Sequence, residues 1–367
     1  MHKHYPHHPL GNFIRAVDER NRSGTVSRLL GVSVNKSFIP SVANTIGTDM
    51  TNYKVVRKGQ FACNLIHVGR DEVIPISLYD KEEDALLSSA YDVFEIIDES
   101  VLLPEYLRLC AMRPEFDRYA MFQAVYGIRG NLPWEDFCAI EIPVPTLAEQ
   151  ERIVSQFATI EERIRQCHER ITLLERTATA LYRKTFVEGI DRNHLPEGWR
   201  MGTLGEVTAI KAGGDMPKDR SDIQTAEYSY PIIANGLEDK GVVGFAKTFA
   251  INEPSVTISA RGTIGYSFVR YSPYYPIVRL ISVIPHNSDL LHYLWYQITA
   301  MDLSGSGSVQ SQLTIPAIMK EDIILPPLDL LVTFEKRVGI ISHTLQNIER
   351  QLPSLEKLKA VILTQIK

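Results

Sequence analysis

The chain has 367 residues, of which 44% are hydrophobic and 23% charged, the composition of a soluble globular protein. This length exceeds one ordinary core and favours two domains with connecting elements. No apolar run approaches a membrane span and the first residues carry no signal-peptide pattern, so the sequence predicts a cytoplasmic protein with no membrane partner.

Cysteine spacing and charge narrow the class of protein further. The four cysteines lie far apart and form no Cys-x-x-Cys pair, which argues against a zinc site and a disulfide framework, so no metal is expected. The formal charge of −5 at pH 7 neither supports nor excludes a nucleic-acid partner. Local patches are more informative, because residues 54–70 and 247–279 are mainly basic and 71–105 is strongly acidic.

Residues 1–145 predict a first domain of mixed α and β structure. Short apolar runs at 53–56 and 73–76 are bounded by turn residues, as strands are. One helix is expected late in this domain, from Glu105 to Met112. The segment 123–131 combines polar residues with glycines and therefore predicts a loop.

Residues 146–189 predict one long helix that follows a proline-rich stretch and ends near Gly189. Apolar residues recur at alternating spacings of four and three, a pattern that indicates a coiled-coil seam. Roughly 40 helical residues at about 1.5 Å each give a length of about 60 Å. The seam residues are Ile153, Phe157, Ile160, Ile164, Cys167, Ile171, Leu174, Ala178 and Leu181.

Residues 190–326 predict a second domain of the same type. Strand-like runs occur at 255–258 and 279–284, and one late helix is expected at 290–300. The order of a mixed domain followed by a long helix therefore occurs for a second time.

Residues 327–367 predict the second long helix, which also follows prolines. Pro353 lies inside it and has no amide hydrogen to donate, so a kink or break is expected there. Lys359 replaces an apolar seam residue beyond the proline. Leu358, Ile362 and Ile366 suggest that the apolar stripe changes register after Pro353.

The two halves of the chain are related by a constant shift of 181 residues, which places Leu132 on Leu313 and Pro145 on Pro326. The nine seam positions shift, without a gap, to Phe334, Val338, Ile341, Leu345, Ile348, Leu352, Leu355, Lys359 and Ile362. Such a repeat indicates a duplicated architecture. We therefore expect an α+β fold in which two mixed α/β domains alternate with two long antiparallel coiled-coil helices.

Several junctions resemble those of type I restriction-modification specificity subunits. Residues 142–154, Ile-Pro-Val-Pro-Thr-Leu-Ala-Glu-Gln-Glu-Arg-Ile-Val, are similar to the start of their helical regions. Residues 195–199, Leu-Pro-Glu-Gly-Trp, followed by Leu204-Gly205, are similar to the opening of their second recognition domain, and Pro9–Ile14 to the opening of the first. The domain-helix-domain-helix order is the most specific element of the resemblance. The chain departs from the pattern at 328–331, where Leu-Asp-Leu-Leu replaces a second Ala-Glu-Gln.

The resemblance implies a non-catalytic DNA-recognition subunit of a restriction system. Residues 1–145 and 190–326 would be target recognition domains, each for one half of an asymmetric, interrupted DNA sequence. The helices at 146–189 and 327–367 would set the gap between the halves and dock two modification (methyltransferase) subunits. Restriction (translocase) subunits would complete the complex. S-adenosylmethionine, ATP and Mg²⁺ are expected in these partners, and no cofactor is expected in this chain.

Base recognition in the major groove favours Arg, Lys, Asn and Gln on exposed loops. On this ground the candidates in the first domain are Asn64, His67, Arg70, Gln123, Tyr126, Arg129 and Asn131. The candidates in the second domain are Lys211, Lys218, Arg220, Asn235, Arg261, Ser306, Ser308, Gln310 and Gln312. The loops 123–131 and 305–312 occupy matching positions in the duplication, where repeat proteins often bind. For any single Lys or Arg, a solvated surface charge is the competing interpretation.

Three alternatives stay open. A coiled-coil adaptor without DNA recognition explains the seam but leaves the paired domains unexplained. An orphan specificity subunit would serve a methyltransferase without restriction partners. A methyltransferase or nuclease is disfavoured, because no glycine-rich loop follows a strand to hold S-adenosylmethionine and no convincing acidic and lysine cluster for a nuclease is present.

Overall fold

A computed structural model describes residues 5–41, 48–66, 68–124, 130–262, 264–301, 303 and 313–367. By packing, the chain divides into two compact units. Unit 1 comprises Met1–Cys167 and Arg350–Lys367, and unit 2 comprises His168–Glu349. The division falls within the two long helices, so the four sequence segments bounded at 145, 189 and 326 stay a prediction.

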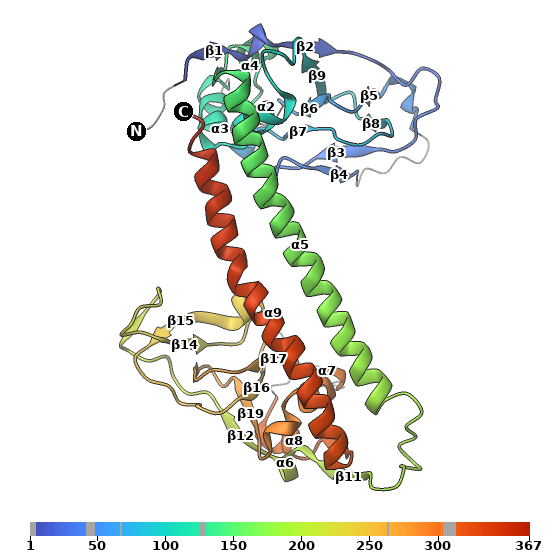
Figure 1. The fold of residues 1–367 in the computed structure, drawn as a ribbon, viewed down its shortest axis with the longest axis vertical. Helices are drawn as coiled ribbons and strands as arrows, with labels where there is room; N and C mark the ends of the chain where they lie inside the picture. The colour runs from blue at the N-terminus through green and yellow to red at the C-terminus, as the bar shows by residue number, and fades with distance from the viewer. Residues whose placement is uncertain are drawn as a thin grey trace. The chain divides into compact units, whose positions relative to one another are not determined.

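Unit 1 contains a central antiparallel sheet in the order β2-β9-β6-β7 (Figure 1). Its strands are β2 (Ile14–Val17), β9 (Asp92–Ile96), β6 (Phe61–Cys63) and β7 (Ile76–Leu78). The unit's short helices are η1 (Leu10–Asn12), η2 (Met50–Asn52), α1 (Val68–Asp71), α2 (Pro104–Ala111), α3 (Pro114–Gln123) and α4 (Trp134–Cys138). The remaining strands form antiparallel pairs: β1 (His7–Pro9) with β10 (Glu141–Pro143), β3 (Leu30–Val32) with β4 (Phe38–Pro40), and β5 (Lys54–Val56) with β8 (Ala85–Leu87).

Both faces of this sheet are covered at its two central strands, β9 and β6. Successive side chains of a strand point to opposite faces, and here they enter two different buried clusters. Phe61 and Phe94 share one cluster with residues of α2, α3 and α4, and their rings stack with centroids 5.0 Å apart. Ala62 and Val93 alternate with them and join the cluster formed by β3, β5 and β8. The central strand β6 is therefore apolar throughout, and β9 is apolar and buried at Val93, Phe94 and Ile96, as covered strands are.

Unit 2 repeats this sheet in the order β12-β19-β16-β17. Its strands are β12 (Thr208–Ala212), β19 (Ile281–Pro285), β16 (Ser255–Ile258) and β17 (Ser267–Arg270). The unit's short helices are α6 (Leu204–Val207), η3 (Glu238–Gly241), η4 (Ser288–Leu290), α7 (Leu291–Ala300) and α8 (Ile315–Met319). The strand β11 (Arg200–Thr203) pairs with β20 (Asp322–Leu325), as β1 does with β10.

A second four-stranded sheet lies in unit 2 where unit 1 has strand pairs. Its order is β13-β15-β14-β18, from β13 (Arg220–Ser221), β15 (Val242–Ala246), β14 (Tyr230–Ile233) and β18 (Tyr275–Pro276). The segments inserted before β6 and β16, and those inserted before β9 and β19, therefore fold differently, although the central sheets agree.

The duplication extends to single hydrogen bonds. Leu10 N donates to Ile140 O at 2.8 Å, and Leu204 N donates to Glu321 O at 3.0 Å. The buried Tyr106 hydroxyl donates to Pro143 O at 3.1 Å. In the same way, the buried Tyr293 hydroxyl donates to Ile324 O. These pairs confirm the predicted duplication and align Leu10-Gly11 with Leu204-Gly205.

The two long helices are α5 (Leu147–Phe186) and α9 (Leu328–Leu363), coloured green and red in Figure 1. In unit 1 the start of α5 packs on the end of α9, where Phe157 and Ile362 share one buried cluster. In unit 2 the end of α5 packs on the start of α9, where the rings of Phe186 and Phe334 lie 4.9 Å apart. The helices are thus antiparallel, and the predicted α+β class is confirmed.

All eighteen predicted seam positions are buried or half-buried, including Lys359. The Lys359 ammonium lies 3.6 Å from a Glu161 carboxylate oxygen and 5.5 Å from the centre of the Phe157 ring. The predicted change of register is wrong, because Leu358 is 45% exposed and the original spacing continues through Ile362. The long aliphatic stem of Lys359 lets it occupy an apolar seam while its charge finds a partner.

Pro353 does not break α9, which continues through it to Leu363. Buried seam residues on both sides, Ile348 and Ile362, hold the helix in place. A proline inside a helix costs about 3 kcal/mol, and packing of an apolar face offsets such a cost.

The late helices α2 and α7 and the strand β16 lie where the sequence predicts them, whereas α3 was not predicted. In the described part of the chain, no helix combines the length and hydrophobicity needed to cross a membrane. The four cysteines carry free thiols.

Candidate nucleic-acid interface

Each unit has an equivalent main-chain hydrogen bond, here called the anchor, at the same end of its central sheet. In unit 1, Leu132 N donates to Leu65 O at 2.8 Å, just beyond β6. In unit 2 the equivalent bond runs from Leu313 N to Ala260 O at 3.2 Å, just beyond β16. Leu132 and Leu313 are partners in the duplication, so the two anchor points correspond.

In unit 1 this anchor depends on two glycines that touch. Gly69 N donates to Gly130 O at 2.9 Å. A Cβ on Gly130 would lie 2.7 Å from the Gly69 Cα, and Gly130 has a φ of +57°, so no other residue fits there without strain. The two glycines place α1 against the end of the segment that follows α3.

Four predicted residues of unit 1 gather near this anchor: Asn64, Arg70, Gln123 and Asn131. Asn64 is a turn residue, because its Oδ1 accepts from Ile66 N at 3.0 Å. Gln123 is half-buried as the last residue of α3, and Asn131 is exposed. His67, Tyr126 and Arg129 lie outside the described residues.

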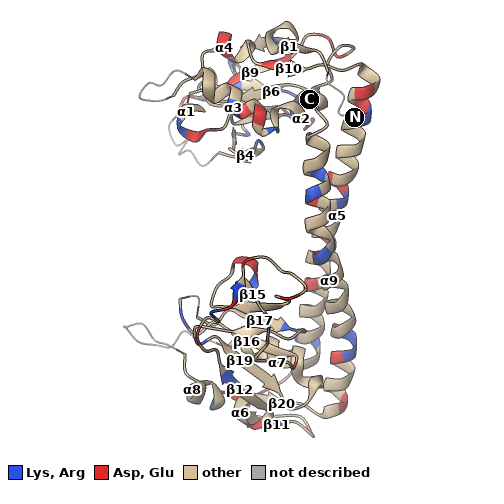
Figure 2. Cartoon of the chain, turned by 90° about the vertical axis from the view of Figure 1, so that its left-hand side faces the viewer, with Lys and Arg blue, Asp and Glu red and all other residues tan. Residues whose placement is uncertain are grey.

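Arg70 is exposed, but it is not a free cation. Its Nε donates to Asp71 Oδ1 at 2.7 Å, and this hydrogen bond raises the pKa of the guanidinium. The other basic residues of the 54–70 patch are also paired, in the ion pairs Lys54–Asp92, Arg57–Glu19 and Lys58–Glu82. Figure 2 shows blue and red residues meeting at α1. The acidic stretch that follows therefore neutralises much of the basic patch.

In unit 2, Asn235 joins two loops at the end of the sheet. Its Oδ1 accepts from Ala260 N at 2.8 Å, and its Nδ2 donates to Val278 O at 2.8 Å. Arg261, the next residue along the chain from Ala260, is exposed. Lys211 is exposed on β12, which ends at the same edge because Ala212 and Ile258 both pair with Ile281. The structure thus brings Lys211, Asn235 and Arg261 to one end of the central sheet, here called its edge.

Two other predicted residues lie elsewhere in unit 2. Lys218 is exposed before β13, and Arg220 is exposed on β13, in the second sheet. Ser306, Ser308, Gln310 and Gln312 lie outside the described residues.

Sequence reasoning missed two residues near the anchors. Phe122 in α3, beside Gln123, is 80% exposed, which is unusual for a phenylalanine. Arg279 is exposed immediately before β19, and it lies in the basic stretch 247–279, so charge pattern alone already pointed to its neighbourhood. Its φ of +58° has no signature in the sequence.

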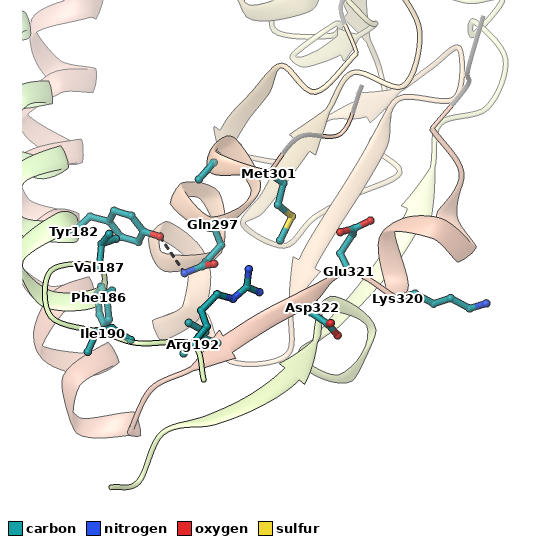
Figure 3. Close-up of a pocket in the computed structure, with 12 residues that line it drawn as sticks. Tyr182, Phe186, Val187, Ile190, Arg192, Gln297, Met301, Lys320, Glu321 and Asp322 are labelled. Carbon is teal, nitrogen blue, oxygen red and sulfur yellow. Dashed lines mark hydrogen bonds between the residues drawn. The ribbon is translucent and has the colours of Figure 1, made fainter. Parts of the chain in front are cut away.

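A pocket of about 680 Å³ lies in unit 2 among the end of α5, α7 and β20 (Figure 3). At one side Gln297 Nε2 donates to the Tyr182 hydroxyl at 3.0 Å. Arg192, Glu321 and Asp322 bring both signs of charge to the lining. Among the residues that the structure describes, no group of three or more His, Cys, Asp or Glu side chains is arranged to hold a metal ion.

A buried Ser-His-Glu series also occurs in unit 2. His292 lies 2.8 Å from the Ser342 hydroxyl through Nε2 and 2.7 Å from Glu335 Oε1 through Nδ1. This order is that of hydrolase triads. Ser342 and His292 are 8% and 2% exposed, however, and the Tyr271 hydroxyl also lies 2.9 Å from Nε2. The series bridges α7 and α9, a structural role that matches the Arg108–Glu161 pair between α2 and α5.

Comparison with known proteins gives consistent results. Residues 196–364 match the model of the type I restriction modification DNA specificity domain. The chain is 35% identical over 126 residues to the putative type I specificity subunit S.MpnORF89P of Mycoplasma pneumoniae, covering 34% of this chain and 38% of that protein. It is 29% identical over 203 residues to S.MpnORF507P of the same organism, covering 55% of each.

A more distant relative is the MjaIX restriction enzyme specificity subunit of Methanocaldococcus jannaschii, 22% identical over 262 residues, with 62% of this chain and 60% of that protein covered. These matches span about two fifths to three fifths of the relatives' lengths. The fold is similar to a type I restriction-modification S subunit of M. genitalium, with a TM-score of 0.70, 15% identity, and 99% and 96% of the two chains covered.

Proposed function

We propose, from the premise that this chain belongs to the type I restriction-modification specificity subunits, that it recognises an interrupted, asymmetric sequence in double-stranded DNA. Each unit would contact one half of that sequence. One observation carries the proposal: both units make an equivalent main-chain hydrogen bond at the same end of the same sheet, from Leu132 N to Leu65 O and from Leu313 N to Ala260 O.

An asymmetric target requires two surfaces of one geometry and different chemistry. Base edges in the major groove are distinguished by the donors and acceptors that side chains present to them. Unit 1 offers amides such as Gln123 and Asn131 at its anchor, whereas unit 2 offers Lys211 and Arg261. The two units are therefore suited to different base sequences.

We assign to the helices α5 and α9 the role of setting the distance between the two half-sites. Each is continuous and passes from one unit into the other. A helix has a fixed rise per residue, so it sets a distance that a flexible linker would not. Contacts with one face of a duplex are favoured at separations near one DNA turn or its multiples, and a set distance serves this need.

The chemistry is assigned to partner subunits. Two methyltransferase subunits would dock on α5 and α9, and S-adenosylmethionine, ATP and Mg²⁺ would bind to the methyltransferase and translocase subunits. This chain would be the non-catalytic member of that assembly and would act in the cytoplasm. The name of the domain matched at 196–364, a DNA specificity domain, supports this division.

The test is to co-express the chain with its neighbouring methyltransferase and to map modified adenines across the genome by single-molecule sequencing. We expect a bipartite motif. The double variant Gln123→Ala, Asn131→Ala should change one half of it, and Lys211→Ala, Arg261→Ala the other. Lys81→Ala, whose ammonium is exposed and pairs with Asp80, is the control and should leave the motif unchanged.

Other outcomes would point to the alternatives. A stable complex that modifies no motif, and shows no salt-dependent DNA binding, would indicate a coiled-coil adaptor. Modification without cleavage in the native host, with no restriction subunit recovered, would indicate an orphan specificity subunit.

A further inference from the structure

A strained two-residue turn lies at the DNA-facing edge proposed for unit 2. Val278 and Arg279 have φ values of +50° and +58°, in the left-handed region. This region is uncommon for any residue with a side chain, and for a β-branched residue such as valine it is a clear outlier. Strain of this kind persists only where the surrounding structure enforces it, and it gathers at functional sites.

Three hydrogen bonds enforce the turn. Val278 N donates to Gly214 O at 2.8 Å, and Arg279 N donates to Gly213 O at 3.1 Å. Asn235 Nδ2 donates to Val278 O at 2.8 Å. Gly213 is itself required, because a Cβ there would lie 2.6 Å from the Pro276 carbonyl carbon. The main chain of the turn is therefore held by two hydrogen bonds at Val278 and one at Arg279.

The turn belongs to the same edge as the loop anchor. Asn235, which bonds Val278, also bonds Ala260 N, and Ala260 O accepts from Leu313 N at the anchor. Arg279 is thus linked to the anchor by a short series of hydrogen bonds through described residues.

Arg279 differs from the basic residues of unit 1 in its charge environment. It is exposed, and its guanidinium makes no ion pair or hydrogen bond to any described residue. Arg70, near the unit 1 anchor, is instead bound to Asp71. A strained main chain that presents an unpaired guanidinium to solvent has no evident stabilising role, because truncating the side chain would cost no internal contact.

We propose that Arg279 is a specificity-determining residue that recognises a guanine in the half-site contacted by unit 2. The inference rests on the proposed function. A guanidinium donates two parallel hydrogen bonds to the guanine O6 and N7 atoms, and this geometry demands a fixed direction of approach. The enforced turn supplies that direction, which a phosphate contact would not need.

Unit 1 has no counterpart of this arginine. The strand registers pair Phe94 with Phe61 and Val283 with Val256, which places Ala90 of unit 1 at the position of Arg279. The guanine contact therefore belongs to one half-site alone, as an asymmetric target requires.

The test uses the complex of this chain with its methyltransferase and maps modified adenines for Arg279→Gln and Arg279→Lys. With Arg279→Gln, we expect one guanine in one half-site to become degenerate and modification of the original motif to fall about 5- to 150-fold. Arg279→Lys should weaken the same base preference, because an ammonium on a flexible stem lacks the rigid planar fork of a guanidinium. Arg200→Gln, whose exposed guanidinium pairs with Glu206, is the matched control and should keep the motif.

Val278→Gly separates the turn from the side chain. Glycine adopts positive φ freely, so this variant should fold, and it should loosen preference at the same guanine while the melting temperature is kept or raised.

A normal motif with Arg279→Gln refutes the inference and leaves the proposed function intact. Uniformly weaker modification with an unchanged motif, rescued by Arg279→Lys, indicates a phosphate contact and refutes it as well. A wild-type complex that modifies no bipartite motif refutes the proposed function and the inference together.

Discussion

Units 1 and 2 share a central sheet and differ in what covers its second face. In unit 1 that face presents Ala62 and Val93 to an apolar cluster. In unit 2 the corresponding positions carry Thr257 and Ser282, which are buried, and Arg270 Nε donates to the Thr257 hydroxyl at 3.0 Å. Burial lowers the pKa of Arg270 to about 10. One sheet therefore supports an apolar layer in one copy and a hydroxyl-rich layer in the other.

The comparison separates two kinds of sequence constraint. Positions on the helix-facing side of the sheet stay apolar in both copies, because α2 packs there in unit 1 and α7 in unit 2. Each of these helices contributes a buried tyrosine, Tyr106 and Tyr293 respectively. Positions on the other side have changed in chemistry together with the inserted segments. We infer that the frame and the inserted segments vary independently, which, on the function proposed above, would let a duplicated chain acquire two specificities.

The largest effect is expected from the shared frame itself. Phe137 is fully buried and contacts Phe94 and Trp134, so Phe137→Ala should reduce the stability of unit 1 by about 3–5 kcal/mol. Its partner in the duplication, Ile318, is also fully buried, and Ile318→Ala should cost unit 2 about 2–5 kcal/mol. Hydrogen exchange read by mass spectrometry should show each loss in its own unit. Equal loosening of both units by either variant would show that they do not have separate cores.

The next effect tests a feature of unit 1 alone. The Lys36 ammonium lies 2.7 Å from Asp117 Oδ2, and both side chains are largely buried. Lys36→Ala leaves a buried carboxylate unpaired, so unfolding by denaturant should show a loss of about 3 kcal/mol. The double variant Lys36→Met, Asp117→Asn should recover most of it. A loss below about 1 kcal/mol in the single variant would show that the pair is solvated.

A smaller and symmetrical effect is expected from the two tyrosines. Tyr106→Phe and Tyr293→Phe each leave a buried carbonyl oxygen without its donor, at Pro143 and Ile324 respectively. Each should cost about 1–3 kcal/mol in denaturant unfolding. Similar costs would confirm that the two bonds are equivalent, whereas a neutral result at one site would show that the repeat is only geometric there.

The smallest effect concerns the coiled-coil seam. Lys359→Leu restores an apolar residue at a half-buried seam position and removes the Glu161 pair. Burial of the added apolar surface should outweigh a partly exposed ion pair, and the midpoint of thermal unfolding should rise, by an amount equivalent to less than about 1 kcal/mol. A fall in the midpoint would show that Lys359 is preferred for its charge.

The sequence predicted what depends on periodicity. The seam and the two late helices rest on local spacing, which burial of one face imposes on any helix. The 181-residue shift follows because the same spacing recurs in the second half of the chain. Arg70 and Asp71 are adjacent in the sequence, but their pairing was not predicted. A basic patch was inferred instead, because charge counts do not show which side chains meet. The Lys58–Glu82 pair joins residues that lie far apart in the chain.

The site was predicted in part for a related reason. Lys211, Asn235 and Arg261 come from three separate strands and loops, and only the sheet register brings them to one edge. The turn at Val278 and Arg279 escaped prediction because nothing in a valine-arginine pair indicates positive φ. The bonds that enforce it come from Gly213 and Gly214, more than sixty residues earlier.

Unit 1 is assembled from two stretches that are far apart in the chain, 1–167 and 350–367, whereas unit 2 is one uninterrupted stretch. Tyr5 N donates to Lys367 O at 2.8 Å, and Arg152 Nη2 lies 3.3 Å from Gln365 Oε1. On a ribosome, unit 2 has all its residues before unit 1 does, although unit 1 is begun first. During synthesis, unit 2 should therefore complete its fold before unit 1. Unit 1 can pair its two long helices only after residues 350–367 have been made.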